Sequence, residues 1–155
     1  MTIAQFPVPP IVKTVMVHAA PARAFALFAG DFGRWWPLAR VHTGLDPVDC
    51  AIEPRAGGRV FERAADGRET AWGTVLTYDP PHRLAFSWIV GLSAEQEQRV
   101  EIRFTAEDRG TRVELTHSGW EKLGDAAVSR RERYDRGWAT IFEQCFVDYV
   151  NAIAT

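Results

Sequence analysis

The sequence predicts one α+β domain in which a curved antiparallel sheet of six to seven strands surrounds a long C-terminal helix. Three observations support this architecture. Segments with strand-like alternation fill the middle of the chain, between short turns. One amphipathic stretch of helical periodicity follows them and runs almost to the C-terminus. The chain has 155 residues, 46% of them apolar, which suits a single domain with one sizeable core.

The N-terminal part predicts an extended arm, one strand and two short helices, over residues 1–10, 11–19, 21–30 and 31–36. Three prolines within the first ten residues favour an unpaired arm, so the domain itself is expected over 11–155. The valine-rich segment that follows alternates like a strand. Pro21 can open the first helix, because proline at the first helical position loses no hydrogen bond.

Six further strands are expected over residues 48–53, 59–64, 69–78, 83–90, 98–106 and 111–117. Turn sequences separate them, among them Asp66-Gly67 and Asp79-Pro80-Pro81. Consecutive strands joined by short turns form an antiparallel meander with one apolar face.

A helix is expected from Asp125 to about Ile153. Its apolar residues recur every three or four positions: Tyr134, Trp138, Ile141, Phe142, Cys145, Tyr149 and Ile153. The inner face of the meander is the one surface large enough to bury that stripe. Gly137 interrupts the helix at a cost of about 1 kcal/mol relative to alanine, which suggests close packing at this point.

Large aromatic side chains are expected between the sheet and the helix. The predicted cavity lining is Trp72, Phe86, Trp88, Phe104, His117, Trp120, Trp138 and Phe142. Rigid rings at several levels are hard to pack without a gap, and an apolar gap is the usual form of a small-molecule site. The alternative is a solid aromatic core. Trp72 joins this face only if a bulge lies near Gly73, and Trp35 and Trp36 form either a gate or a lid packed on the core.

Several motifs in the middle of the chain carry a family resemblance. They are Gly57-Gly58-Arg59, Asp66-Gly67, Trp72-Gly73-Thr74-Val75, the run from Asp79 to Trp88, the run from Leu115 to Trp120, and Gly137-Trp138. Together they resemble the activator of heat-shock-protein-90 ATPase homologue-like family, within the SRPBCC or START-like superfamily, over residues 11–153. The resemblance implies a helix-grip fold and favours the cavity. It implies no single activity, because helix-grip domains include lipid carriers, polyketide cyclases and chaperone cofactors.

The composition argues against several classes of partner. A net charge of −2 does not favour nucleic acid. The densest basic cluster, at residues 130–136, is interleaved with acidic residues, as on a solvated helix face. Cys50 and Cys145 form neither a disulfide framework nor a zinc motif. The N-terminus lacks a secretory signal and no apolar run reaches the ~20 residues of a membrane span, so a cytoplasmic location is expected.

No catalytic residue, metal ligand or cofactor is predicted. His117 is the best polar candidate, since it shares a face with Val113 and Leu115, and it is expected to be partly buried against the helix. It is either a hydrogen-bonded core residue or a group for proton transfer or ligand contact. Glu62 is interpreted as facing solvent, because Phe61 favours the register that turns its neighbour outward.

Three functions agree with these observations. The first is binding or carrying of a small apolar or aromatic ligand in an internal cavity. The second is a cavity enzyme of the cyclase, dehydratase or isomerase kind, although an enzyme should show at least two convergent polar groups and the sequence indicates one. The third is an interaction module with a chaperone or another protein as its partner. A homodimer also stays open.

Overall fold

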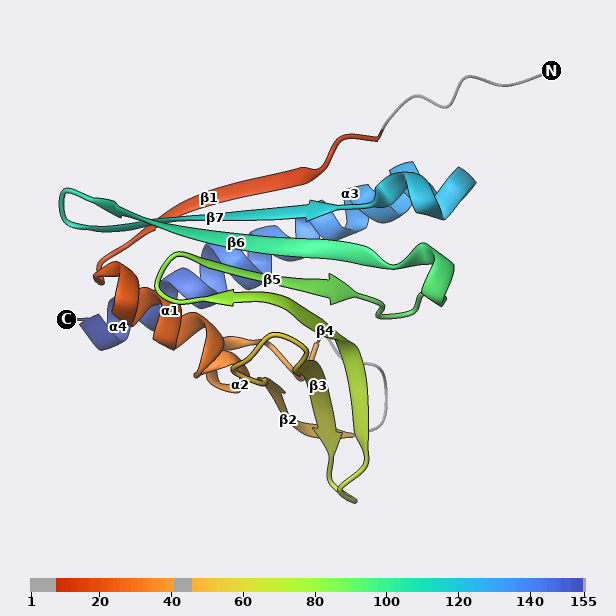
Figure 1. Ribbon diagram of the computed structural model, residues 1–155, viewed down its shortest axis with the longest axis horizontal. Helices are drawn as coiled ribbons and strands as arrows, with labels where there is room; N and C mark the ends of the chain where they lie inside the picture. The colour runs from red at the N-terminus through yellow and green to blue at the C-terminus, as the bar shows by residue number, and fades with distance from the viewer. Residues whose placement is uncertain (1–7, 41–45, 155) are drawn as a thin grey trace.

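A computed structural model describes residues 8–40 and 46–154 (Figure 1). The predicted N-terminal arm falls largely outside these residues, and Val8 to Pro10 have no regular secondary structure. The elements follow one another as β1 (Ile11–Val17), α1 (Pro21–Ala29), α2 (Phe32–Trp35), β2 (Pro47–Ile52), β3 (Arg59–Ala64), β4 (Glu69–Asp79), β5 (Arg83–Trp88), β6 (Gln98–Glu107), β7 (Gly110–Ser118), α3 (Ala127–Trp138) and α4 (Val147–Ala154). Short 3₁₀ turns lie at Ala94–Gln96 and Trp120–Ala126, and a π-helical segment at Ala139–Phe146 joins α3 to α4.

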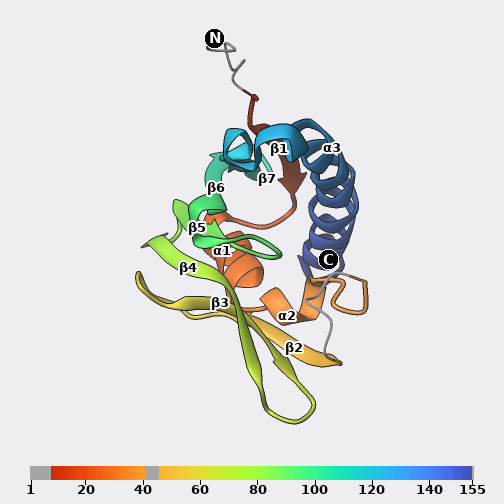
Figure 2. The same ribbon diagram turned by 90° about the vertical axis from the view of Figure 1, so that its right-hand side faces the viewer.

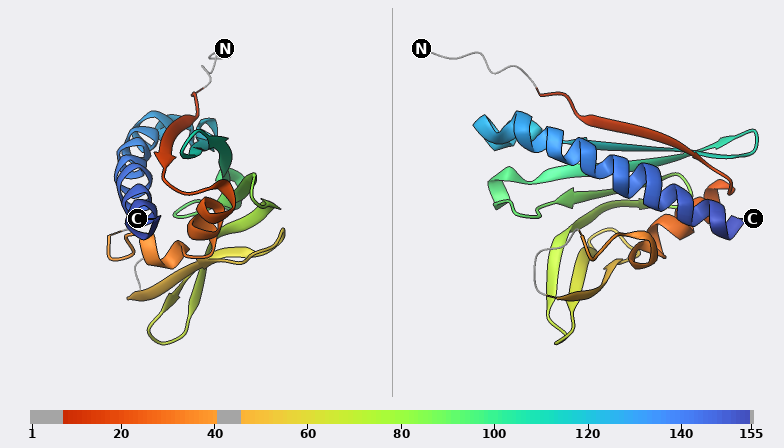
Figure 3. Two further views of the ribbon diagram at one scale, coloured as in Figure 1. Left: turned by 90° about the vertical axis from the view of Figure 1, so that its left-hand side faces the viewer. Right: turned by 180° about the vertical axis from the view of Figure 1, so that it is seen from behind.

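The strands form one seven-stranded antiparallel sheet in the order β1-β7-β6-β5-β4-β3-β2, which confirms the predicted meander. The first strand pairs with the last, Val15 opposite Val113. Seen end-on, the sheet curves around α1, and the C-terminal helix runs along its open side (Figure 2). From behind, that helix crosses the sheet from end to end (Figure 3). The α+β helix-grip architecture is therefore confirmed.

The π-helical segment changes which helix residues face the core. The predicted stripe is correct at Trp138, Ile141 and Phe142, which are buried. Beyond them the buried face shifts, because Phe146 and Val150 are buried, Cys145 and Tyr149 are half-buried, and Ile153 is exposed. A π turn holds more residues than an α turn, so residues four apart stay on one face through this segment. That shift cannot be read from a period of 3.6.

A bulge in β4 brings Trp72 to the inner face, as the sequence required. Val60 pairs with Gly73 and Phe61 pairs with Ala71, which leaves Trp72 as the extra residue. Trp72 and Val75 are consequently both buried. Glycine is needed next to the bulge, because a Cβ on Gly73 would lie 1.7 Å from the carbonyl oxygen of Ser87 on β5.

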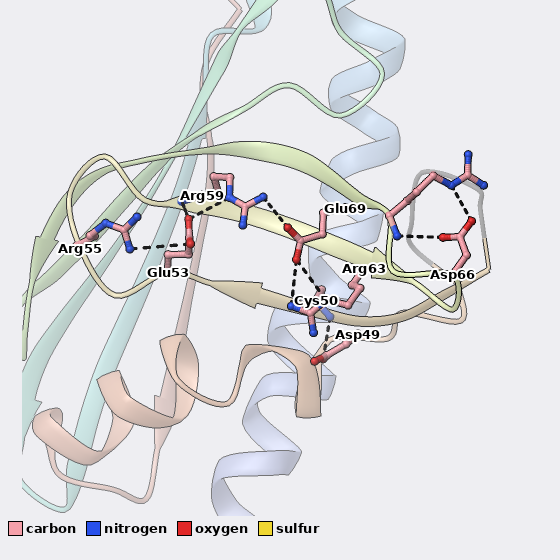
Figure 4. A network of polar contacts seen from close by, with 9 residues as sticks. Asp49, Cys50, Glu53, Arg55, Arg59, Arg63, Asp66 and Glu69 are labelled. Carbon is pink, nitrogen blue, oxygen red and sulfur yellow. Dashed lines mark hydrogen bonds and ion pairs between the residues drawn. The ribbon is translucent and has the colours of Figure 1, made fainter.

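The outer face of β3 carries a chain of ion pairs (Figure 4). Arg59 lies 3.1 Å from Glu53 and 3.0 Å from Glu69, and Arg63 lies 3.0 Å from the same Glu69. The Arg59 guanidinium also covers the ring of Phe61, with 4.2 Å from its carbon to the ring centroid. Phe61 is thus buried by arginine side chains on the outer face and not by the core.

The prediction that Glu62 faces solvent is wrong. Because Phe61 finds its cover on the outer face, strand alternation turns Glu62 inward, where it is 2% exposed. The Trp72 indole N–H donates a hydrogen bond of 2.7 Å to its carboxylate. Glu62 also pairs across the sheet with the buried Cys50. Burial, followed by the charges of Asp49 and Glu62, raises the pKa of the Cys50 thiol to about 12.

Candidate functional site

A groove of about 520 Å³ opens between the C-terminal helix and the aromatic end of the core. It is partly open to solvent, in contrast to the enclosed cavity that the sequence suggested. Its lining is Trp36, Arg40, Trp88, Arg130, Arg133, Tyr134, Gly137, Trp138 and Ile141. The size falls within the range of small-molecule sites, which is about 300–1,000 Å³.

One face of the helix forms a wall of this groove. Arg130, Tyr134, Gly137 and Ile141 follow one another at spacings of three or four residues and so lie along a single helix face. At Gly137 no side chain projects into the groove, and the space there is empty, since a Cβ built on it meets no atom within 4 Å. The close packing suggested for Gly137 is therefore wrong, and the missing side chain widens the groove.

Indole rings form the floor. Trp36, which follows α2, contacts Trp88 on β5 and Trp138 on the helix, with ring centroids 6.1 and 5.9 Å apart. The Trp88 and Trp138 centroids are 6.2 Å apart and their planes are tilted by 57°. A third ring stacked between them would need about 7 Å, twice the carbon–carbon contact distance. A flat ligand therefore fits over these rings and not between them.

The indole N–H groups of Trp88 and Trp138 both donate to acceptors that are buried or half-buried. Trp88 donates to the Tyr134 hydroxyl oxygen at 3.1 Å, and Trp138 donates to His117 Nδ1 at 3.0 Å. Since the Tyr134 oxygen already accepts, its own proton points to no acceptor among residues 8–40 and 46–154. That proton is available to an oxygen atom of a ligand in the groove.

His117 lies behind the groove and not in it. The side chain is fully buried and contacts Trp138 of the helix, so it faces the predicted side but lies deeper than the partial burial that was expected. Because Nδ1 accepts from Trp138, the ring proton must be on Nε2, which lies 2.6 Å from Gln98 Oε1 and donates to it. The opposite orientation of the Gln98 amide would bring two donors together. The amide nitrogen of Gln98 consequently has no partner in the described part of the chain.

Burial lowers the pKa of His117 to about 3, so the imidazole is neutral at physiological pH. Both ring nitrogens are engaged, and Trp138 separates them from the groove. This geometry suits a core residue that fixes the Trp138 ring. It does not suit proton transfer, since a general acid or base needs a pKa near the working pH and access to the substrate.

The structure divides the predicted site residues into two groups. Trp36, Trp88 and Trp138 line the groove, although they are themselves buried, at 5%, 1% and 2% exposed. The others are buried behind it: Trp35, Trp72, Phe86, Phe104, His117, Trp120 and Phe142. Trp35 packs on the core as a lid would, since its side chain is buried and its indole N–H donates to the Phe28 carbonyl oxygen at 3.0 Å. Phe104 packs on Phe25 under α1 with ring centroids 5.1 Å apart.

The sequence did not predict the polar residues that line the groove, which are Arg40, Arg130, Arg133 and Tyr134. The two helix arginines were assigned to a solvated face. A signal existed, because Arg130 and Arg133 precede Trp138 by eight and five residues and so flank the same helix face. Arg40 lies in an irregular segment, where no periodicity could place it.

The chain belongs to the family described as activator of Hsp90 ATPase homolog 1-like protein, whose sequence pattern matches residues 18–150. No curated protein sequence matches it. Among solved structures it is similar to the anthrahydroquino-gamma-pyrone synthase Txn09 complexed with SUM, at 33% identity over 83% of this chain and 88% of the other, with a TM-score of 0.56.

Two bacterial proteins share the fold at lower identity. BH1534 of Bacillus halodurans is 21% identical over 94% of this chain and 99% of its own, with a TM-score of 0.67. MLL2253 of Mesorhizobium loti is 17% identical over 88% and 93%, with a TM-score of 0.65. In the portion of the chain that the structure describes, no helix is long and apolar enough to cross a membrane. The same residues contain no cluster of metal-ligating side chains.

Proposed function

We propose that this protein binds a small, flat aromatic molecule in the groove beneath its C-terminal helix. The observation that carries the proposal is the groove itself, which opens to solvent and is lined by Tyr134, Gly137 and Ile141 above three buried indole rings. Aromatic faces bind planar ligands through dispersion and apolar burial. Tyr134 adds a directional donor, as is usual in sites where a few polar groups orient an apolar ligand.

Gly137 allows a direct test, because its substitution fills the groove without meeting protein atoms. The probe is the uncharged fluorophore N-phenyl-1-naphthylamine, whose emission rises in an apolar site. We expect it to bind the wild-type protein and Gly137→Ala, and we expect Gly137→Trp to reduce its affinity by at least about tenfold, since one indole occupies much of such a site. Equal affinities for all three proteins, or no binding by the wild type, would contradict the proposal.

Both variants should remain folded, because alanine and tryptophan each favour a helix more than glycine does. Thermal unfolding of each variant controls for this point. A Gly137→Trp protein that keeps its melting temperature and loses the probe locates the binding site in the groove.

A second candidate function is ring closure of a bound aromatic substrate. It is favoured by the 33% identity to an anthrahydroquino-gamma-pyrone synthase. Tyr134 is then the groove residue placed to act as a general acid toward a substrate oxygen, since its hydroxyl oxygen is held by Trp88 and arginine does not give up its proton. Among the described lining residues there is no histidine and no carboxylate to act as a base.

The test is to incubate the protein with an anthrahydroquinone whose side chain is able to close to a γ-pyrone, and to follow the product by mass spectrometry. Tyr134→Phe should lower the rate by at least about 100-fold if the hydroxyl is a general acid, and should leave binding of the probe largely unchanged. Ring closure at the uncatalysed rate with wild-type protein would leave binding alone as the function.

A further inference from the structure

Three arginines surround the groove with unpaired guanidinium groups. Arg40, Arg130 and Arg133 line it, and in the described regions none of their guanidinium groups makes a hydrogen bond or an ion pair. Arginines elsewhere on the surface bind carboxylates, namely Arg55, Arg59, Arg63, Arg68, Arg99, Arg103 and Arg112. Arg131, between two of the groove arginines in sequence, donates to the backbone oxygens of Pro9 and Pro10. Ion pairs are thus common among the arginines of this surface. Arg23, Arg83, Arg109 and Arg136 also lack one among the described residues, but the groove brings three unpaired arginines together.

The charge of the lining has one sign. Its described residues include no aspartate or glutamate, although Glu132 and Asp135 stand in the same helical turns. Asp135 lies on another side of the helix, 3.1 Å from Lys13. Two of the arginines stand on the helix and Arg40 follows α2, so cationic groups come from two different elements around the aromatic floor.

We infer that the ligand of this groove is a planar aromatic anion, its rings packed against Tyr134 and Gly137 above the buried indole rings and its negative group among Arg40, Arg130 and Arg133. This inference rests on the proposed function and adds the class of ligand to it. Guanidinium groups donate paired N–H groups that match a carboxylate, sulfonate or enolate. An anion also relieves the repulsion among three like charges that have no counter-charge of their own. The Tyr134 proton supplies a further donor to an oxygen of the same ligand.

A matched pair of probes separates charge from shape. N-phenyl-1-naphthylamine and 8-anilino-1-naphthalenesulfonate share one ring skeleton, and only the second carries a negative group. We expect the sulfonate to bind about tenfold more tightly, as a few charge-assisted contacts at a partly exposed site would give. Raising the salt concentration to about 1 M shortens the Debye length to roughly 3 Å and should reduce that preference.

Substitution of the arginines identifies their role. In the double variant Arg130→Gln, Arg133→Gln the two probes should bind within about twofold of one another, because most of the charge is gone while the indole floor is intact. The control is Arg136→Gln, which is exposed on the same helix, lacks an ion pair among the described residues, and does not line the groove. It removes the same kind of charge and should keep the wild-type preference. Gly137→Trp should weaken both probes.

The outcomes distinguish the inference from the proposed function. If both probes bind the wild type equally and Gly137→Trp weakens both, the groove binds aromatic ligands and the inferred anionic class is wrong. If the sulfonate keeps its advantage in the double variant, or loses it equally in Arg136→Gln, the charge acts from elsewhere and the inference also fails. If neither probe binds, the proposed function fails together with the inference.

Discussion

Replacing His117 should change the pH dependence of stability as well as stability itself. In the folded chain, burial lowers the pKa of His117 to about 3 from its ordinary value of 6.5. A lowered pKa means that the unfolded chain takes up a proton at a pH where the folded chain does not. The wild-type protein should therefore lose stability as the pH falls from 6.5 toward 3, and the contribution of His117 is fully favourable only above pH 6.5.

The size of the effect follows from the width of that window. Each pH unit inside it costs about 1.4 kcal/mol, so lowering the pH from 6.5 to about 5 should reduce the free energy of unfolding by ~2 kcal/mol. Arginine partners lower the pKa of Glu53 and Glu69 below the ordinary 4.5, so their stabilising contribution is lost only at lower pH.

The assay is urea unfolding at several pH values between about 5 and 7.5, for the wild type and for His117→Gln. Glutamine can still accept a hydrogen bond from the Trp138 indole, so the variant should fold with a cost of about 1–3 kcal/mol. Its free energy of unfolding should fall by ~2 kcal/mol less than that of the wild type across this range. Parallel pH curves for the two proteins would refute the reasoning. Histidine NMR signals provide a second check, since His117 should not titrate above about pH 4.

Further substitutions and reagents test the packing. Gly73→Ala should cost at least about 3 kcal/mol of unfolding free energy, because its Cβ would overlap the Ser87 carbonyl oxygen, whereas Gly137→Ala should gain up to about 1 kcal/mol. Similar melting temperatures for the two alanine variants would contradict the assigned contacts. Trp138→Ala should cost roughly 3–5 kcal/mol and weaken N-phenyl-1-naphthylamine binding, which is measured well below the melting temperature of the variant. Cys50 should react with a thiol reagent only on unfolding, since burial keeps its thiol protonated. Chelator and reductant should leave the melting temperature unchanged, and a large fall with either would show a metal or a disulfide contribution.

Local patterns predicted the sheet well because each strand carries its own signal. β3 has the predicted bounds, Arg59–Ala64, since turn residues limit it on both sides. The alternation in β5 and β6 placed Phe86, Trp88 and Val100 on the buried face, and all three are buried. The family resemblance is confirmed on the same motifs. These features depend on neighbours within a few residues, which a sequence displays directly.

The site was predictable only in part, because it is formed by elements distant in the chain. Trp88 and Trp138 were expected from alternation and helical periodicity, and both line the groove. Glu62 was misplaced because Phe61 was assigned to the core, whereas Arg59 and Arg63, two residues away on the same strand, cover its ring on the outer face. Whether the bulky residues enclosed a cavity or packed solidly also depended on the distances between facing rings.

The sequence by itself determined the order of the elements, the meander, the long C-terminal helix and the aromatic character of the interior. Hydrophobic periodicity and turn chemistry act over a few residues, and they are sufficient for these properties. The tertiary structure decided that Trp36 joins Trp88 and Trp138 in one floor, that His117 is sealed behind it, and that unpaired arginines surround an open groove. These properties depend on which side chains from separate elements meet and at what distance. They also depend on the π-helical segment, which changes the residues that the helix turns toward the core.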